Sequence, residues 1–334
     1  MAGAGKRVLI TGASGFIGGR LARFLLERGF EVRGTGRKRY PFEKLGLEGA
    51  SFFTADLTSG EGLDELVDGC EIVVHAAARS EAFGPRSLFV DANITATERL
   101  LEASRRCGVK RFVFLSSPSI YFGGRDVLNA SESTPPSTLR DPYAETKRIA
   151  DEFVLSENSA SFQTISLRPR MVTGEGDDKF FPRFLRAMDS GKLKQMRGHD
   201  PLVHITAIEN LLEALLLAIN ADESACGATY NIANAEPIRL FTMLAQLAEL
   251  TGRPFAPSAI PFPIAYSAAS LVEGAYRLFG RQDDPPLFRL QVEVMRYSLT
   301  LDLSAARERL GYAPSIDNDE TLRRFAEYAR ATGI

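Results

Sequence analysis

A turn built on three glycines, close to the start of the chain, constrains the fold more than any other feature of the sequence. The apolar run Val8-Leu9-Ile10 leads to Gly12, and Gly15 and Gly18 follow at intervals of three residues, where a helical pattern begins. Such a turn lets backbone N–H groups and the positive end of the helix dipole face a pyrophosphate. Glycine is needed where a side chain would block that approach. By itself, the turn predicts only a place for a phosphate.

Strand and helix patterns alternate from this turn to about residue 170. The alternation predicts an α/β fold with a Rossmann-type, doubly wound parallel sheet and helices on both faces. The predicted strands after the first are Phe30–Thr35, Ala50–Ala55, Glu71–Ala76, Arg111–Leu115 and Phe162–Leu167. The predicted helices are Phe16–Arg28, Gly62–Val67, Leu88–Cys107 and one that begins at Pro142.

The alternation ends after residue 170, and the rest of the chain reads as a smaller α+β portion. We expect residues 1–170 to form the nucleotide-binding domain, with returning segments from the C-terminal half, and residues 171–334 to form the substrate-binding portion. Its predicted helices are Phe180–Ser190, Ile208–Ala218, Thr242–Leu250 and one from Thr321. Its predicted short strands are Leu193–Met196, Leu202–Ile205 and Tyr230–Ala233.

The charge balance and the cysteines narrow the class of protein. Forty basic and 42 acidic side chains nearly cancel, which argues against a general nucleic-acid surface. Cys70, Cys107 and Cys226 are odd in number and far apart, so we expect small, buried free thiols in a reducing compartment. The first apolar run is too short for a secretion signal, so we expect a cytoplasmic protein. His199 and His204 have no partners at metal-ligand spacing, and no metal is predicted.

One stretch is apolar enough to be weighed as a membrane segment. Residues 255–272 carry no charge, but they include three prolines and three serines, which argue against a spanning helix. From Ile264 onward, a helical pattern places apolar residues on one face, which favours packing over a core or a substrate pocket. Shallow contact with a membrane surface remains the alternative. The residues of this face are Ala268, Leu271, Val272, Ala275, Leu278 and Phe279.

The sequence after the second strand indicates which dinucleotide is bound. Gly36 is followed by Arg37, Lys38 and Arg39, and no carboxylate lies between Glu31 and Glu43. An acidic residue at this place would bond the ribose hydroxyls of NAD, whereas an arginine accommodates the 2′-phosphate of NADP. We therefore predict a preference for NADPH, with NADH possible and a solvated cationic loop as the alternative.

Small and polar residues follow the next two strands. Asp56 follows the third strand and has two interpretations, a bond to the adenine amino group or a cap for the helix Gly62–Val67. The fourth strand runs into Ala76-Ala77-Ala78, whose small side chains would let a cofactor lie close. His75, within an apolar run, is expected to be a packed core histidine.

Three side chains suited to proton transfer lie near the ends of later elements. Ser116 and Ser117 follow the fifth strand, where ligands bind in such sheets. Asp141 and Pro142 signal a helix start, which places Tyr143 and Lys147 one turn apart on the same helical face. Together with the glycine turn, this spacing indicates a catalytic site.

With these motifs in place, nearly the whole chain resembles the extended short-chain dehydrogenase/reductase superfamily. The resemblance is carried by Thr11-Gly12-Ala13-Ser14-Gly15-Phe16-Ile17-Gly18, Asp56-Leu57, His75-Ala76-Ala77-Ala78, Ser116-Ser117, Tyr143-Ala144-Glu145-Thr146-Lys147 and Leu167-Arg168-Pro169.

The C-terminal half is similar to the 3β-hydroxysteroid dehydrogenase-like branch, and within it to the bacterial 2-alkyl-3-oxoalkanoate reductases. Glu175 departs from the usual proline, and Phe122 separates Tyr121 from Gly123 where many members have Tyr-Gly. The similarity is carried by the run Leu167–Asp177, Phe181-Pro182-Arg183, Ser190–Leu193, Ile208-Glu209-Asn210, Pro285–Phe288, Asp302–Tyr312 and Arg39-Tyr40-Pro41.

The resemblance implies a role for each candidate. Tyr143 would be the general acid in ketone reduction, Lys147 would favour its phenolate and bond the nicotinamide ribose, and Ser117 would bond the substrate oxygen, with Ser116 as the fallback. Asn93 would act through a water relay or through helix packing. The implied cofactor-binding residues are Gly12, Ser14, Gly15, Phe16, Ile17, Gly18, Arg37, Asp56, Leu57, Ala76, Ala77, Ala78, Tyr143, Lys147 and Pro169.

These observations predict an NADPH-dependent enzyme that reduces a hydrophobic ketone, 3-oxoacyl or steroid-like, to a secondary alcohol. The alternatives are a nucleotide-sugar epimerase or dehydratase, and a dinucleotide sensor without catalysis. A homodimer through the helices near Asn93–Cys107 and Tyr143–Glu157 is expected from the resemblance alone. Phe83, Met171, Phe180 and Phe181 would build an apolar pocket, where Arg170 or Arg183 could meet a substrate carboxylate.

We expect Arg37→Ala to lower the selectivity for NADPH over NADH, because it removes the cation that would pair with the 2′-phosphate. A charge-assisted contact of this kind corresponds to a change of about tenfold or more. The ratio of kcat/KM for the two cofactors measures it. An unchanged ratio would show that Arg37 does not read the phosphate.

Overall fold

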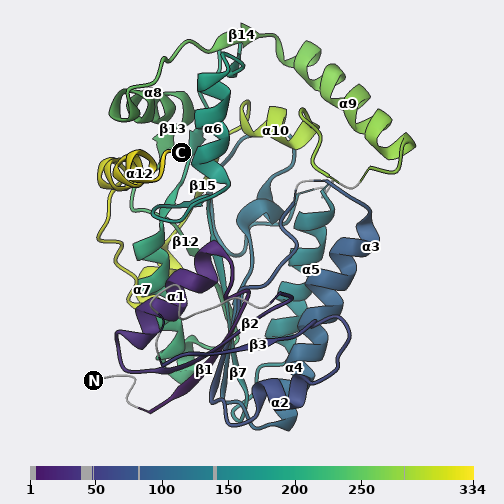
Figure 1. Cartoon of the computed structure of the whole chain (residues 1–334), viewed down its shortest axis with the longest axis vertical. Coiled ribbons are helices and arrows are strands. Elements are labelled where there is room, and N and C mark those ends of the chain that lie inside the picture. Colours follow the sequence, from purple (N-terminus) through teal and green to yellow (C-terminus); the bar gives the residue numbers. More distant parts are fainter. Residues whose placement is uncertain (1–4, 39–46, 48, 82, 138–140, 282) are drawn as a thin grey trace.

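A parallel seven-stranded sheet forms the centre of the computed structural model, which describes residues 5–38, 47, 49–81, 83–137, 141–281 and 283–334 (Figure 1). The strand order is β12-β7-β5-β4-β1-β2-β3, and every neighbouring pair is parallel. This confirms the predicted α/β fold with a parallel sheet. The strands are β1 Arg7–Thr11, β2 Glu31–Gly36, β3 Ser51–Thr54, β4 Ile72–His75, β5 Arg111–Leu115, β7 Gln163–Pro169 and β12 Ala228–Ile232.

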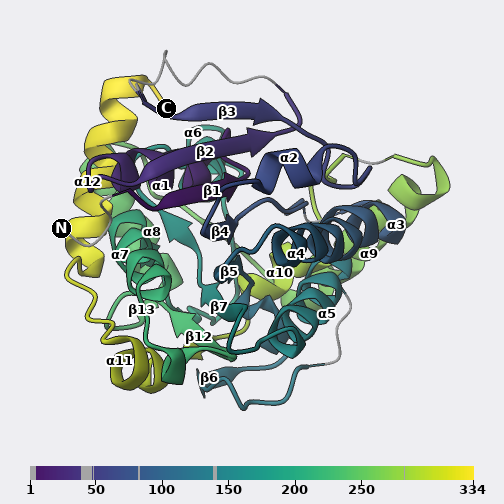
Figure 2. The ribbon, with the colours of Figure 1, turned by 90° about the horizontal axis from the view of Figure 1, so that it is seen from below.

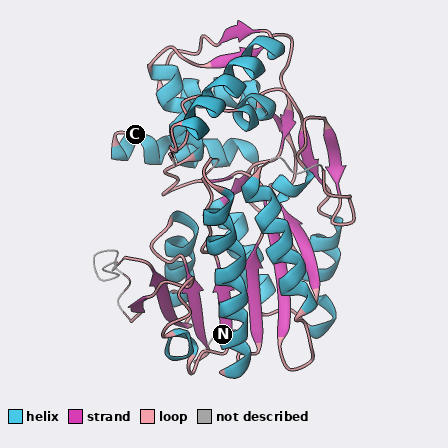
Figure 3. Ribbon diagram, turned by 90° about the vertical axis from the view of Figure 1, so that its right-hand side faces the viewer, coloured by secondary structure: helices cyan, strands magenta, loops and turns pink. Residues whose placement is uncertain are grey.

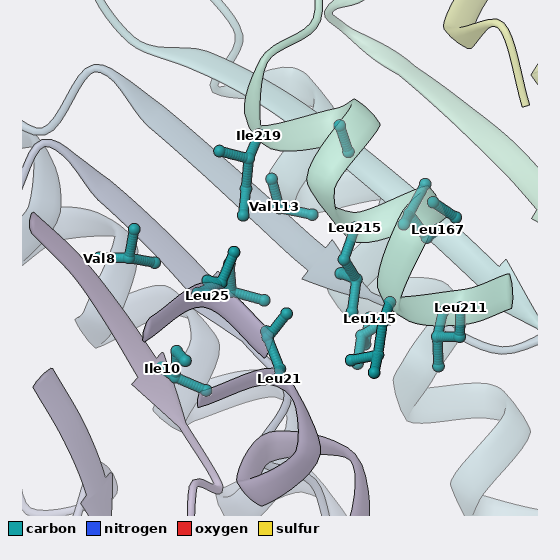
Figure 4. Packing of buried hydrophobic residues seen from close by; sticks show 14 of the residues in the cluster. Val8, Ile10, Leu21, Leu25, Val113, Leu115, Leu167, Leu211, Leu215 and Ile219 are labelled. Carbon is teal, nitrogen blue, oxygen red and sulfur yellow. The ribbon is translucent and has the colours of Figure 1, made fainter. Parts of the chain in front are cut away.

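Helices cover both faces of the sheet, and the side chains of β1 alternate between the two layers (Figure 2). Val8 and Ile10 pack against α1 (Phe16–Leu26) and α7 (Ile208–Ile219), as the close view in Figure 4 shows. Leu9 points into the opposite core. Burial on both faces explains why these strands read as nearly continuous apolar runs. The opposite layer contains α2 Leu63–Val67, α4 Ala96–Arg106 and α5 Pro142–Ser156.

The long helix predicted over residues 88–107 consists of three consecutive pieces. These are α3 Arg86–Phe89, a π-helical segment η2 Val90–Thr95, and α4. The π-helical turn buries Asn93. Single π-turns inside α-helices are frequent at functional sites.

The C-terminal part lies beyond the end of the main sheet and has its own apolar core (Figure 3). Phe181, Leu244 and Phe325 are buried in it. Its helices are α6 Phe180–Asp189, α8 Leu240–Thr251, α10 Arg289–Val294 and α12 Asn318–Thr332, while α11 Ser304–Leu310 packs on the main sheet.

Short strands form the small sheets of this part. A four-stranded sheet has the order β13-β10-β15-β6, and two pairs, β11-β8 and β14-β9, complete the set. Their bounds are β6 Val127–Ala130, β8 Val172–Thr173, β9 Lys194–Met196, β10 Leu202–Val203, β11 Thr206–Ala207, β13 Ile238–Arg239, β14 Ser258–Ile260 and β15 Leu299–Leu301, and the remaining short helices are η3 Pro118–Tyr121 and η4 Glu223–Ala225.

The sequence patterns assigned one strand to the wrong part of the fold and did not predict β6, β8, β11, β13, β14 or β15. The run predicted over residues 230–233 is β12, which pairs with β7 and so belongs to the main sheet. Strand β6 was missed because two of its four residues, Leu128 and Asn129, are exposed, and Asn129 has a φ of +56°, so no alternating pattern forms.

Helix α9 (Phe262–Leu278) corrects one expectation about side-chain burial. The face that the sequence predicted to pack over a core includes Leu271, Leu278 and the following Phe279, yet these are 76%, 82% and 77% exposed. The buried residues of α9 are Ala265, Ala269 and Glu273. Small alanines allow close approach to the neighbouring core. Glu273 anchors the helix, because its two carboxylate oxygens accept hydrogen bonds from the backbone N–H and the Nε of Arg289, at 2.7 and 2.8 Å.

Among the described residues, no helix combines the length and apolar character needed to cross a membrane.

The orientation of α9 predicts opposite outcomes for two substitutions on the same helix. Ala269→Leu should destabilise the protein by about 1–3 kcal/mol, because it forces extra volume into a packed core. Leu271→Ser should change the free energy of unfolding by no more than about 0.5 kcal/mol, since Leu271 is exposed. Urea denaturation of both variants measures the difference. The reverse ranking would show that the apolar face packs inward.

Candidate active site

A cavity of about 800 Å³ lies at the carboxyl ends of the main-sheet strands. Gly12 follows β1, Arg37 follows β2, Ala76 follows β4, Ser116 follows β5, and Pro169 ends β7. The cavity therefore lies where ligands bind in open parallel sheets. The predicted cofactor-binding and catalytic residues that line it are Gly12, Ser14, Gly15, Phe16, Ile17, Gly18, Arg37, Asp56, Leu57, Ala76, Ala77, Ala78, Ser117, Tyr143, Lys147 and Pro169.

The glycine turn brings three backbone segments into direct contact. A Cβ on Gly18 would lie 2.3 Å from the carbonyl oxygen of Gly12, and one on Gly12 would lie 3.0 Å from the Cα of Ala77. Gly12 also has a φ of +66°, which favours glycine. The turn is closed by a 2.9 Å hydrogen bond from the N–H of Gly15 to the Gly12 carbonyl.

The first turn of α1 suits a pyrophosphate. Gly15 occupies the N-cap position, and no side chain of the described residues caps this end of the helix. The cavity wall includes Ser14, Gly15 and Phe16 at this point. The free N–H groups and the helix dipole therefore face the cavity, and the residues present fit the diphosphate of a dinucleotide.

The carboxylate of Asp56 is engaged by its own turn. Its Oδ1 accepts hydrogen bonds from the backbone N–H and the hydroxyl of Thr58, at 2.9 and 2.7 Å, and these bonds lower the pKa of Asp56. The expectation that Asp56 could cap the helix over residues 62–67 was wrong. Helix α2 begins after Gly62, whose left-handed conformation starts it, and the Asp56 turn ends before that point. Arg39, the third cation of the predicted loop, and Arg39-Tyr40-Pro41 lie outside the described residues.

His75 is a neutral core residue, as predicted. It is fully buried, and burial lowers its pKa to about 3. Its Nδ1 is 2.7 Å from the hydroxyl of Thr11, which also accepts a bond from the Ala77 N–H, and its Nε2 is 3.0 Å from the hydroxyl of Thr97. These contacts tie β1, β4 and α4 together beneath the cavity floor.

Lys147 is buried at the cavity, and Tyr143 is half-buried there. Burial raises the pKa of Tyr143 to about 12, and the charge of Asp141 adds to this, whereas a hydrogen bond with the Ser117 side chain opposes it. Burial lowers the pKa of Lys147 to about 7, against the attraction of Asp151. The Nζ of Lys147 lies 3.9 Å from the ring centroid of Phe114. The Tyr143 phenol therefore holds its proton and can act as a donor.

The two serines after β5 differ in their contacts. The side chain of Ser117 hydrogen-bonds Tyr143 and accepts a bond from the Ser119 N–H at 3.2 Å. The Ser116 hydroxyl is buried and has no hydrogen-bond partner among the described residues. Of the two, Ser117 is the one joined to Tyr143.

Asn93 ties the wall of the cavity to the helix that carries Tyr143. Its Oδ1 accepts a bond from the Arg79 N–H at 2.7 Å, and its Nδ2 donates to the Thr146 hydroxyl at 3.0 Å. These contacts support the packing interpretation of Asn93. The alternative role, in a water relay, stays a prediction.

The predicted apolar pocket is divided among three places. Met171 and Phe180 line the main cavity, whereas Phe181 is fully buried in the C-terminal core. Phe83 lines a smaller pocket of about 70 Å³ together with Phe122. Met171 has a φ of +45°, a strained conformation for a residue with a side chain and one that clusters at functional sites.

The remaining expectations concern Glu175, the three cysteines and metal binding. Glu175, the departure from the usual proline, pairs with Arg20 at 2.7 Å. The three cysteines are free thiols, and only Cys70 is fully buried. No group of three potential metal ligands occurs in the part of the chain that the structure describes.

A glycine turn and a Ser–Tyr–Lys set around one cavity of a parallel sheet define an NAD(P)-dependent oxidoreductase of the extended short-chain dehydrogenase/reductase class. A sequence profile of the NAD dependent epimerase/dehydratase family matches residues 8–233, and the chain belongs to this family.

Similar proteins span nearly the whole chain. A 2-alkyl-3-oxoalkanoate reductase of Stenotrophomonas maltophilia is 33% identical and aligns over 96% of this chain and 98% of its own length. A 3 beta-hydroxysteroid dehydrogenase/Delta 5-->4-isomerase of Mycobacterium tuberculosis is 31% identical over 96% of this chain and 90% of its own. Among solved structures, MoeE5 in complex with UDP-glucose and NAD is 26% identical, with a TM-score of 0.76 and coverage of 98% and 100%.

Two adjacent glycines of α1 should respond differently to alanine. Gly18→Ala should destabilise the fold by about 1–3 kcal/mol and weaken dinucleotide binding, since the new Cβ collides with the Gly12 backbone. Gly19→Ala should be neutral or stabilising by up to roughly 1 kcal/mol, because its Cβ would lie 3.4 Å from the nearest atom, the Ala13 oxygen. Thermal unfolding and fluorescence titration with NADPH measure both effects. Equal behaviour of the two variants would contradict the contact.

Proposed function

We propose that this protein reduces a hydrophobic ketone to a secondary alcohol with NADPH. The observation that carries the proposal is the Ser117–Tyr143–Lys147 set, which lines the same cavity as the glycine turn. A sensor of the dinucleotide would not need a phenol hydrogen-bonded to a serine beside a buried lysine. NADP, when bound in its reduced form, supplies the hydride.

In this proposal Tyr143 gives its proton to the ketone oxygen as negative charge develops there. The raised pKa of Tyr143 keeps the phenol protonated until the substrate oxygen takes the proton. Lys147, close by on the next turn of α5, then stabilises the phenolate that remains. Ser117 holds the substrate oxygen through its hydroxyl, next to the phenol.

The choice of NADPH rests on the cavity wall after β2. Arg37 lines the cavity there, and β2 ends in Thr35 and Gly36, neither of which can bond ribose hydroxyls through a carboxylate. Asp56, the nearby acid, is engaged by Thr58. A 2′-phosphate would find a cation at this place.

The substrate class rests on the apolar wall and on the relatives. Phe180 and Met171 line the same cavity as the glycine turn. A 3-oxo acid with alkyl branches, as in the name of the Stenotrophomonas relative, or a steroid-like ketone would suit such a wall.

A second candidate, a nucleotide-sugar epimerase or dehydratase, is favoured by the likeness to MoeE5, which was solved with UDP-glucose and NAD. Such an enzyme returns the hydride to its substrate. It would therefore convert the sugar without net consumption of NADPH.

The test is NADPH oxidation at 340 nm with a panel of 3-oxoacyl, steroid and nucleotide-sugar substrates, with Tyr143→Phe as the matched variant. We expect turnover with a hydrophobic ketone, and a loss of roughly 10²–10⁴ in kcat for Tyr143→Phe, with NADPH binding nearly unchanged because the ring is retained.

Unchanged turnover in Tyr143→Phe would refute the proton-donor role. Conversion of a nucleotide sugar with no oxidation of NADPH would favour the second candidate.

A further inference from the structure

We propose that Arg170 and His204 form a buried binding site for the carboxylate of the substrate. The proposal rests on the proposed function and makes it more specific, because it selects a 3-oxo acid over a neutral ketone.

The guanidinium of Arg170 is buried and has no counterion within the part of the chain that the structure describes. The residue is 8% exposed, and its Nε and Nη2 atoms have no hydrogen-bond partner among the described residues. Burial lowers the pKa of Arg170 to about 10, with no opposing acidic side chain. Its cationic contact is the Phe122 ring, whose centroid lies 5.9 Å from Cζ, at the outer limit for such an interaction. A buried cation is normally paired with an anion, so an anion bound next to Arg170 would stabilise its charge.

His204 adds a second donor of the same kind. Its Nδ1 accepts a 2.9 Å hydrogen bond from the backbone N–H of Leu301. The neutral ring therefore carries its proton on Nε2, and this buried atom has no partner among the described residues. His204 and Arg170 stand two residues before Thr206 and Val172, which are partners in the parallel β11–β8 pair, so the backbone brings the two residues close together. Burial lowers the pKa of His204 to about 4, and the charges of Arg170 and Arg307 add to this. Both side chains thus offer N–H donors and lack an acceptor.

Arg170 itself lines neither pocket, but its backbone is fixed beside residues that do. Its N–H donates to the Ile232 carbonyl at 3.1 Å, and its carbonyl accepts the hydroxyl of Thr206 at 2.6 Å. Its chain neighbours, Pro169 and Met171, line the main cavity. Phe122, over which the guanidinium lies, lines the smaller pocket. A substrate carboxylate bound by Arg170 would lie next to the wall that Pro169 and Met171 form in the main cavity.

Arg183, the other arginine considered for a carboxylate, already has partners. Its Nη2 donates to the Gln291 side chain at 3.3 Å, its Cζ lies 4.8 Å from the Phe288 ring centroid, and the charge of Asp284 opposes the effect of burial on its pKa. These contacts satisfy Arg183 in part and leave Arg170 as the cation that a carboxylate would stabilise.

The experiment compares a 2-alkyl-3-oxo acid with its methyl ester in the wild type, Arg170→Gln, Arg170→Lys and Arg183→Gln. We expect Arg170→Gln to raise KM for the acid about 10- to 100-fold, the range of a lost charge-assisted contact. The KM for the ester and the melting temperature should stay unchanged, and Arg170→Lys should recover part of the preference. A lower melting temperature with an unchanged acid-to-ester ratio would show that Arg170 is structural and would overturn the proposal.

A binding measurement separates this proposal from the proposed function. Calorimetric titration of the NADP⁺-loaded protein with decanoate should show binding that Arg170→Gln abolishes, whether or not any ketone is reduced. Decanoate binding without ketone reduction would retain the carboxylate site and refute the reductase. Ketone reduction that does not depend on Arg170 would support the reductase and refute the carboxylate site at Arg170. Loss of acid preference only in Arg183→Gln would lead to the same conclusion.

Discussion

The close contact between the start of α1 and the end of β1 determines the geometry of the site. Gly18 lies so near the Gly12 carbonyl that no side chain fits between them, and Gly12 in turn lies against Ala77 at the end of β4. This packing sets the free N–H groups of the helix at the cavity wall. Because β1 and β4 are neighbours, the same contact fixes the distance from the first turn of α1 to the loop after β4.

Below this wall, a chain of satisfied polar groups ties two strands to a helix, whereas two buried cations lie at or near the cavity. Thr11, His75 and Thr97 form a chain of hydrogen bonds in which every ring nitrogen is used. Lys147 and Arg170, by contrast, are buried cations whose pKa values are lowered by burial. A folded protein tolerates such groups where ligands will meet them, since an unpaired buried charge is otherwise a cost to stability.

Much of the nucleotide-binding half could be predicted from the sequence because its signals are local. The glycine spacing, the start of α5 at Asp141 and Pro142, and the buried strand β5 each depend on neighbours within one element. Less of the C-terminal half could be predicted from the sequence. Residues 230–233 read as a short apolar strand in either sheet, and only pairing with β7 assigns them to the main one.

Helix α9 shows most clearly what the sequence pattern could not predict, because its periodic apolar residues face outward while Ala265, Ala269 and Glu273 pack inward. The sequence alone determined the parallel sheet, the phosphate turn and the spacing of Tyr143 and Lys147, since these follow from backbone periodicity and turn chemistry. The tertiary structure decided which serine meets Tyr143 and what Asp56 bonds. It also placed Arg170 beside Phe122 and His204, with no counterion among the described residues. Those outcomes depend on contacts between residues far apart in the chain, which no local pattern records.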